Sequence, residues 1–208
     1  MPGGTARLAA ALLLAAAPCF AAGPDKALSG VLQAIEENQL GLATERVEAL
    51  LAAHPNFRLA HLIRGDLLMA RSRPLETFGN VPKTVPREKV EDLRAEALSR
   101  LRALRDRPNG DQVPRHLLQL APDQKHALVV DSRRSRLYVF ENVAGRPRYV
   151  ADYYVTLGKN GVEKTREGDQ KTPIGVYHVT ANLPRQKLTD FYGAGAYPIN
   201  YPNAWDKR

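Results

Sequence analysis

The stretch HALVVDSRRSRLYVFE, residues 126–141, decides the fold of the C-terminal part of this 208-residue sequence. An apolar run, 126–131, and an alternating run, 136–141, flank a short polar segment, which predicts an antiparallel hairpin. Residues 148–157 (RYVADYYVTL) predict a third strand, and residues 174–180 (IGVYHVT) a fourth. Strands this frequent, with Gly-rich turns between them, predict a sandwich or an open barrel over residues 125–208.

Upstream of this β-rich segment, residues 22–105 are predicted to be helical. Apolar residues recur at helical spacing in four runs within residues 28–35, 47–51, 59–69 and 90–104. We expect a turn at Gly41, between the first two runs, and a loop over the proline-containing segment 71–86. Two interpretations stay open, a tetratricopeptide-type hairpin and a small helical bundle. The fold class expected for the chain is therefore α+β.

Composition changes near residue 124. All eight tyrosines and the one tryptophan follow that position, and residues 125–208 carry a net charge of +6 against +1 for residues 22–124. Residues 106–124 hold three prolines and an Asn-Gly pair, which predicts a linker. Its apolar patch at Leu117, Leu118 and Leu120 is expected to dock on a neighbouring element.

Residues 1–21 resemble a secretory signal peptide. Arg7 precedes a ten-residue apolar core, 8–17, and small residues allow cleavage after Ala21. The alternatives are a buried N-terminal helix and a signal lipidated at Cys19. We expect an exported, periplasmic protein without a membrane span once the signal is removed. Export makes nucleic acid an unexpected partner, although the net charge of the sequence is +8.

The order of short motifs over residues 130–203 resembles the L,D-transpeptidase (YkuD-type) catalytic domain, in its Gram-negative periplasmic branch. The motifs are Val130-Asp131, Arg136-Leu137-Tyr138-Val139, Asp152-Tyr153-Tyr154-Val155, Leu157-Gly158-Lys159, Glu167-Gly168-Asp169, Lys171-Thr172-Pro173-Ile174-Gly175-Val176-Tyr177, Asp190-Phe191-Tyr192-Gly193 and Ala196-Tyr197-Pro198-Ile199-Asn200-Tyr201-Pro202-Asn203. The helical region lies outside this resemblance.

The resemblance implies a partial, mainly-β, sandwich-like catalytic domain that acts on the stem peptides of peptidoglycan. In that family a cysteine thiolate attacks the peptide bond after the L-centre of meso-diaminopimelate, and D-alanine leaves. An amine then resolves the acyl-enzyme. No cofactor and no metal are implied, and a protein partner could bind the helical region. The acceptor amine stays open, so cross-linking, protein anchoring and protein release are all compatible with the sequence.

The sequence departs from the family at its catalytic residues. It has no His-Gly pair, and its single cysteine is Cys19. No residue is therefore predicted to be catalytic, and the catalytic histidine and cysteine are expected beyond Arg208. We expect a truncated fragment rather than a shortened, non-catalytic relative, and a chain that is inactive as given. His178, in the middle of a predicted strand, is expected to be a packing or edge residue.

Substrate-side candidates remain near the Tyr-Pro-Asn region. A basic residue could meet peptidoglycan carboxylates, and polar or aromatic side chains could line a groove; the alternative for each is an ordinary solvated or packed side chain. These candidates are Lys171, Tyr192, Tyr197, Asn200 and Tyr201. The leading functional hypothesis is an exported L,D-transpeptidase-type acyltransferase, and the alternative is a non-catalytic peptidoglycan-binding or scaffolding module.

Overall fold

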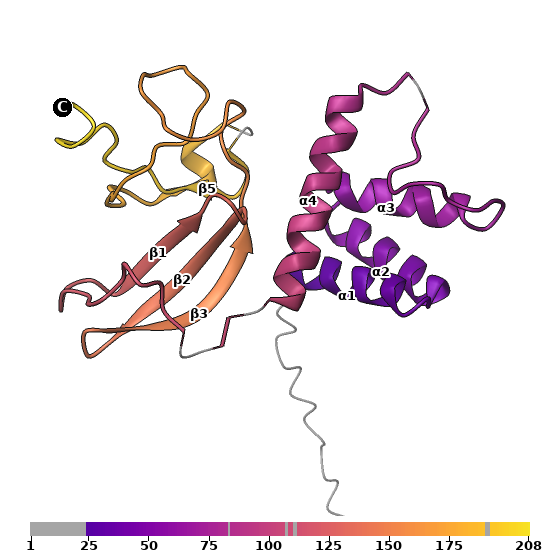
Figure 1. Cartoon of the computed structure of the whole chain (residues 1–208), viewed down its shortest axis with the longest axis horizontal. Helices are drawn as coiled ribbons and strands as arrows, with labels where there is room; N and C mark the ends of the chain where they lie inside the picture. Colours follow the sequence, from indigo (N-terminus) through magenta and orange to yellow (C-terminus); the bar gives the residue numbers. More distant parts are fainter. Residues whose placement is uncertain (1–23, 83, 107, 110–111, 190–191) are drawn as a thin grey trace, which may run out of the picture. The chain divides into compact units, whose positions relative to one another are not determined.

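The structure is a computed structural model that describes residues 24–82, 84–106, 108–109, 112–189 and 192–208. The predicted signal segment, with Cys19, lies outside the described residues. Contacts divide the chain into two compact units, with the boundary between Ala97 and Leu98. The α+β class is confirmed, since four helices precede a small antiparallel sheet (Figure 1).

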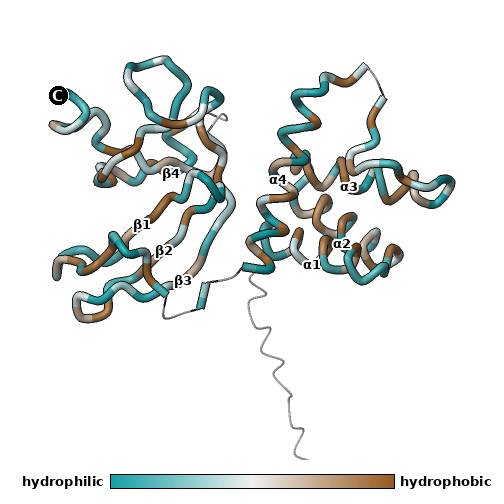
Figure 2. The backbone as a smooth tube through the Cα atoms, in the orientation of Figure 1, coloured by the Kyte–Doolittle hydropathy of each residue, from teal (hydrophilic) through white to brown (hydrophobic). Residues whose placement is uncertain are grey.

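Four helices form the N-terminal half: α1 (Pro24–Glu36), α2 (Leu40–Ala53), α3 (Arg58–Met69) and α4 (Arg87–Arg105). Helix α1 packs on α2, and α2 packs on α3. The apolar stripes predicted from the sequence supply the core, whose most buried side chains are Leu28, Val31, Val47, Leu59 and Ile63. Helix α4 is mostly hydrophilic along its length (Figure 2). No helix in the described part of the chain is long and apolar enough to cross a membrane.

The loop between α3 and α4 is held by a buried carboxylate. Asp66 is 5 % exposed, and its two oxygens accept hydrogen bonds from the backbone N–H groups of Gly79 (2.6 Å) and Asn80 (2.9 Å). Gly79 has φ +75°, and a Cβ there would lie 3.1 Å from Leu62 and 3.2 Å from Val90. This turn therefore needs glycine both for its backbone conformation and for its close packing.

The turn between α1 and α2 lies earlier than predicted. Asn38 takes the left-handed conformation, with φ +56°, and α2 begins at Leu40, so Gly41 is already helical. Asparagine is one of the few residues with a side chain that tolerates this conformation. The prediction of a turn at Gly41 is therefore wrong.

A three-stranded antiparallel sheet in the order β1-β2-β3 forms the centre of the second unit. The strands are β1 (His126–Asp131), β2 (Arg136–Val143) and β3 (Arg146–Tyr154). The predicted hairpin is confirmed, with Val129 opposite Tyr138 and Asp131 opposite Arg136. A bulge interrupts the β2–β3 register between Val139 and Phe140. Phe140 is 2 % exposed and packs edge-to-face on Tyr149, with ring centroids 6.1 Å apart.

The predicted fourth strand over 174–180 is wrong. This segment contributes an isolated bridge, Val179 to Ile199, and the remaining assigned strands are the two-residue β4 (Leu183–Pro184) and β5 (Gly195–Ala196). The facing segment contains Pro198 and Pro202. Because proline has no N–H to donate, a regular ladder cannot continue along it.

The segment before β1 docks on the sheet through Leu120, and Leu117 of the same patch is half-buried. Leu120 is 4 % exposed and donates its N–H to the carbonyl of Gly145, in the β2–β3 turn, at 3.0 Å. Asn142 of β2 donates to the carbonyls of Ala121 (2.9 Å) and Gln124 (2.8 Å). Leu118 is 84 % exposed. The expected docking is therefore observed for Leu120, and it is wrong for Leu118.

Candidate functional site

Two of the predicted substrate-side residues, Asn200 and Tyr201, lie beside the segment that follows the Thr-Pro motif. The Oδ1 atom of Asn200 accepts the N–H of His178 at 2.7 Å, and the Asn200 N–H donates to the carbonyl of His178 at 3.1 Å. These two contacts lie next to the Val179–Ile199 bridge, and the Thr180 N–H donates to the Pro198 carbonyl on its other side. Asn200 therefore joins two segments that are about 20 residues apart in the sequence.

Tyr201 belongs to a small aromatic and basic cluster around Tyr177. Its ring packs edge-to-face on Tyr177, with centroids 6.0 Å apart, and the Nζ atom of Lys164 lies 5.7 Å from its centroid. Both distances are within the range of favourable aromatic and cation–π contacts. The tyrosine predicted to line a groove thus also helps to hold the loop that carries Lys164.

A carboxylate that sequence reasoning missed completes this cluster. The Tyr177 hydroxyl donates to Asp206 at 2.8 Å, and the Asn203 N–H donates to the other oxygen of Asp206 at 2.8 Å. Burial, followed by the bond to Asp206, raises the pKa of Tyr177 to about 12. Asn203 was the one residue whose type could have indicated this turn from the sequence. Its Oδ1 accepts the Trp205 N–H at 2.8 Å, and asparagine commonly bonds the backbone two positions later in such turns.

The glycine-rich segment 158–172 is an ordered loop closed by Asp169. The side chain of Asp169 is 8 % exposed and accepts the Nζ of Lys164 at 2.7 Å. It also accepts the backbone N–H groups of Thr165, Arg166 and Lys171 at 2.9–3.1 Å. The bond from Lys164 is the largest cause that lowers the pKa of Asp169 below its ordinary value of 3.8. Lys164 is therefore committed to an internal ion pair.

Gly158 permits the ends of this loop to meet. Its N–H donates to the Thr172 hydroxyl at 2.7 Å, and a Cβ at this position would lie 2.3 Å from the backbone oxygen of Gln170. Glu163 and Gln170 both take positive φ, 63° and 58°. The loop thus holds two non-glycine residues in a strained conformation, which its internal hydrogen bonds must stabilise.

Of the other three predicted residues, the two tyrosines are exposed and the lysine is half-buried. Tyr192 is 52 % exposed and Tyr197 is 65 % exposed. Lys171 is half-buried, with its N–H on Asp169. Among the described residues, no hydrogen bond or ring contact joins the side chains of Lys171 and Tyr197 to Asn200 or Tyr201. The structure thus brings two of the five predicted residues to the cluster around Tyr177.

The described residues offer several groups that can bind a ligand. They contain no cysteine, and they contain no group of three or more His, Cys, Asp or Glu side chains that could hold a metal ion. The side chains at hand are hydrogen-bonding amides, exposed phenols and lysine ammonium groups. These groups suit a ligand with carboxylates and amides.

Comparison with known proteins finds one family and similar solved structures. Residues 125–208 match the family YkuD, described as the L,D-transpeptidase catalytic domain. One solved structure, "Structure of Bdellovibrio bacteriovorus Bd1075", is 32% identical over 44% of this chain, with a TM-score of 0.37. The present chain covers 33% of that chain's length. No curated protein matches the sequence.

Proposed function

Residues 125–208 match the L,D-transpeptidase catalytic domain, and from this premise we propose that the chain is an exported L,D-transpeptidase-type acyltransferase of the periplasm. The observation that carries the proposal is the match itself, which covers the whole sheet and the cluster around Tyr177. The substrate is the stem peptide of peptidoglycan, a chain of amides with several carboxylates.

The proposed role of the described residues is to bind and orient that peptide. Exposed phenols at Tyr192 and Tyr197 offer apolar contact area and a hydroxyl, and Lys171 offers a cation. Asn200 and Tyr201 contact His178 and Tyr177, and these contacts hold the 177–178 segment beside the 200–201 segment. The net charge of +6 over residues 125–208 favours approach to an acidic wall polymer.

The acyl transfer itself needs a thiol. In the family's chemistry a thiolate attacks the peptide carbonyl carbon, the C–N bond breaks, and the amine of D-alanine leaves with a proton. An acceptor amine then attacks the thioester and returns the thiolate. Because the one cysteine in these 208 residues is Cys19, within the predicted signal, we propose that this chain by itself forms no acyl-enzyme.

The experiment that tests the proposal measures turnover and binding in parallel. The 208-residue chain is incubated with purified tetrapeptide-rich peptidoglycan, and released D-alanine and co-sedimented protein are quantified. We expect co-sedimentation without D-alanine release. Release of D-alanine would overturn the proposed inactivity, and absence of binding would contradict a wall substrate.

A second candidate function is a non-catalytic peptidoglycan-binding or scaffolding module, with a protein partner on the helical unit. The observation in its favour is the combination of exposed aromatic side chains, including Trp205 at 70 % exposure, with described residues that contain no cysteine. The two functions differ in one result. If coding sequence follows residue 208, its expression together with these residues should confer D-alanine release on a transpeptidase and should leave a scaffolding module inactive.

Export is tested separately. Residues 1–30 fused to a phosphatase that is active only in the periplasm should give phosphatase activity in a Gram-negative host. Replacing Leu12 and Leu13 by Arg within the apolar core should abolish that activity, because charge in this core blocks signal recognition. Full activity of the double substitution would contradict a signal peptide.

A further inference from the structure

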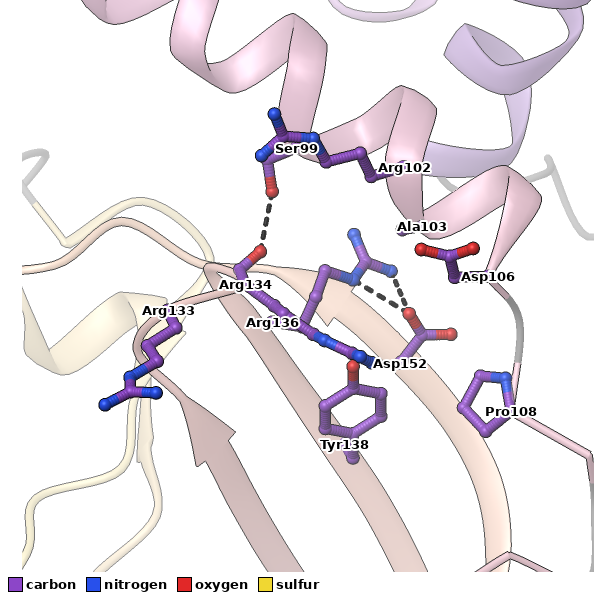
Figure 3. Close-up of a pocket in the computed structure, with 10 residues that line it drawn as sticks. All are labelled: Ser99, Arg102, Ala103, Asp106, Pro108, Arg133, Arg134, Arg136, Tyr138 and Asp152. Carbon is purple, nitrogen blue, oxygen red and sulfur yellow. Dashed lines mark hydrogen bonds and ion pairs between the residues drawn. The ribbon is translucent and has the colours of Figure 1, made fainter.

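A small open cavity of about 80 Å³ lies in the second unit, between the C-terminal end of α4 and the β1–β2 turn. It is separate from the cluster around Tyr177. The wall from α4 includes Ser99, whose hydroxyl donates to the carbonyl of Arg134 at 2.7 Å. The opposite wall is the face of the sheet that carries Tyr138 and the Arg136–Asp152 pair (Figure 3).

The floor of the cavity is the nearly buried ion pair of Arg136 and Asp152, whose opposite charges neutralise each other. Arg136 donates from Nε and Nη2 to one oxygen of Asp152, with the Nε contact at 2.8 Å. The Tyr149 hydroxyl donates to the other oxygen of Asp152 at 2.6 Å. The Asp152 carboxylate therefore has a donor on each oxygen, and it is a poor candidate for binding a cation.

The remaining charges that line the cavity are mostly positive. They are the guanidinium groups of Arg102, Arg133 and Arg134, against the single carboxylate of Asp106. Within the described residues, neither Arg102 nor Arg133 forms a side-chain ion pair. Arg134 lies 3.8 Å from Asp131, with 63% of its own side chain exposed, so this ion pair is weak.

Tyr138 adds a neutral donor. Its hydroxyl lies beside the end of the Arg134 side chain (Figure 3), and this proximity raises the pKa of Arg134. A phenol hydroxyl can donate its hydrogen to an anion that a guanidinium also binds. Figure 3 shows the end of the Arg134 side chain beside the Tyr138 hydroxyl, with the end of Arg136 turned to Asp152. The Arg102 side chain ends beside Ser99, and the Arg133 side chain points away.

We propose that this cavity binds a small oxyanion, a phosphate or carboxylate group, through the Arg134 guanidinium and the Tyr138 hydroxyl, with Arg102 on the facing wall. Guanidinium forks match the paired oxygens of both anions. The carboxylate of Asp106 opposes such a ligand and limits its affinity. This inference is independent of any activity on peptidoglycan.

The test is a titration of the full chain, labelled with ¹⁵N, with sodium phosphate and separately with sodium acetate at constant ionic strength. Backbone amide shifts near Ser99 and Arg134 should saturate, while those of the 158–172 loop should not change. Saturation by phosphate alone, or by acetate alone, assigns the source of the anion. Equal shifts across all basic segments would show an adventitious ion only and would overturn the proposal.

Substitutions separate a site from a general charge effect. Arg134→Gln should weaken binding about five-fold, and Arg102→Gln and Tyr138→Phe about two-fold each. Arg133→Gln removes the same charge from the adjacent residue and should change the affinity by less than about two-fold. Asp106→Asn should strengthen binding, a direction that damage to the fold would not produce. Equal losses for Arg133→Gln and Arg134→Gln would overturn the proposal.

Discussion

Arg136 and Asp152 form a nearly buried ion pair diagonally across strands β2 and β3, with side chains that are 9% and 16% exposed. In the strand register Arg136 faces Tyr154 and Asp152 faces Tyr138, so the pair spans one diagonal step on a single face of the sheet. Tyr149 donates to the second oxygen of Asp152 at 2.6 Å. The pair therefore links both strands and the residue at the β3 bulge.

Asp152→Ala should destabilise the chain by about 3 kcal/mol, because it removes the carboxylate that accepts two hydrogen bonds from the nearly buried guanidinium of Arg136. The matched control is Glu141→Ala, which removes the ion pair of Glu141 with Arg148 in the same strands. The side chains of Arg148 and Glu141 are 64% and 32% exposed, and loss of their pair should cost less than about 1 kcal/mol. Urea unfolding measures both variants, and similar losses would contradict the difference in burial.

Gly158→Ala should open the 158–172 loop and destabilise the second unit by about 2 kcal/mol or more, because the new Cβ would lie 2.3 Å from a backbone oxygen. Gly41→Ala is the control, since Gly41 is in a helix and a Cβ added there would meet no atom within 4 Å. That change should raise stability by about 0.5–1 kcal/mol. Thermal unfolding compares the two, and an unchanged midpoint for Gly158→Ala would refute the close approach.

Asp169 should make the second unit sensitive to acid. Its pKa in the folded chain is lowered below 3.8, mainly by the bond from Lys164. A lowered folded-state pKa gives stability that is fully present above about pH 4 and is lost as the pH falls through the folded-state pKa. Asp169→Asn should therefore lower stability at pH 7 and reduce its dependence on pH below about 4. Parallel pH profiles for the two proteins, from urea unfolding at each pH, would be inconsistent with this assignment.

Asp66→Ala should destabilise the helical unit by about 2–3 kcal/mol, because the N–H groups of Gly79 and Asn80 lose their acceptor in a partly buried turn. Asp92→Ala, at an exposed position on α4, should change stability by less than about 0.5 kcal/mol. Amide hydrogen exchange gives a second measurement, since Gly79 and Asn80 should lose protection in Asp66→Ala alone. Unchanged protection in Asp66→Ala would exclude this role.

Much of the architecture was predictable because it depends on local periodicity. The alternation in 136–141 and the helical stripes around Leu28, Val47 and Ile63 each place apolar side chains on one face, which the structure buries. Motif order also identified the family match over residues 125–208. The prediction of a fourth strand at residues 174–180 was wrong because an apolar pattern carries no information about the partner segment. In that partner, Pro198 and Pro202 interrupt the ladder.

Site residues were less predictable. The sequence singled out Asn200 and Tyr201, and the structure brings both to the segment around Tyr177 and His178. No sequence pattern indicated that Lys164 would pair with Asp169 and lie over the Tyr201 ring. Nor did any pattern indicate the bond from Tyr177 to Asp206, 29 positions later. Whether Lys171, Tyr192 and Tyr197 contact a substrate stays a prediction.

The sequence by itself determined the α+β class, the hairpin at residues 126–141 and the absence of cysteine after Cys19, because composition and short-range periodicity carry that information. Only the tertiary structure decided which charges are neutralised. Asp152, Asp169 and Asp206 each receive donors from distant or loop residues, and Arg134 and Tyr138 meet Ser99 and Asp106 at one cavity. Such pairings depend on register and loop closure, which bring together residues that no local pattern relates.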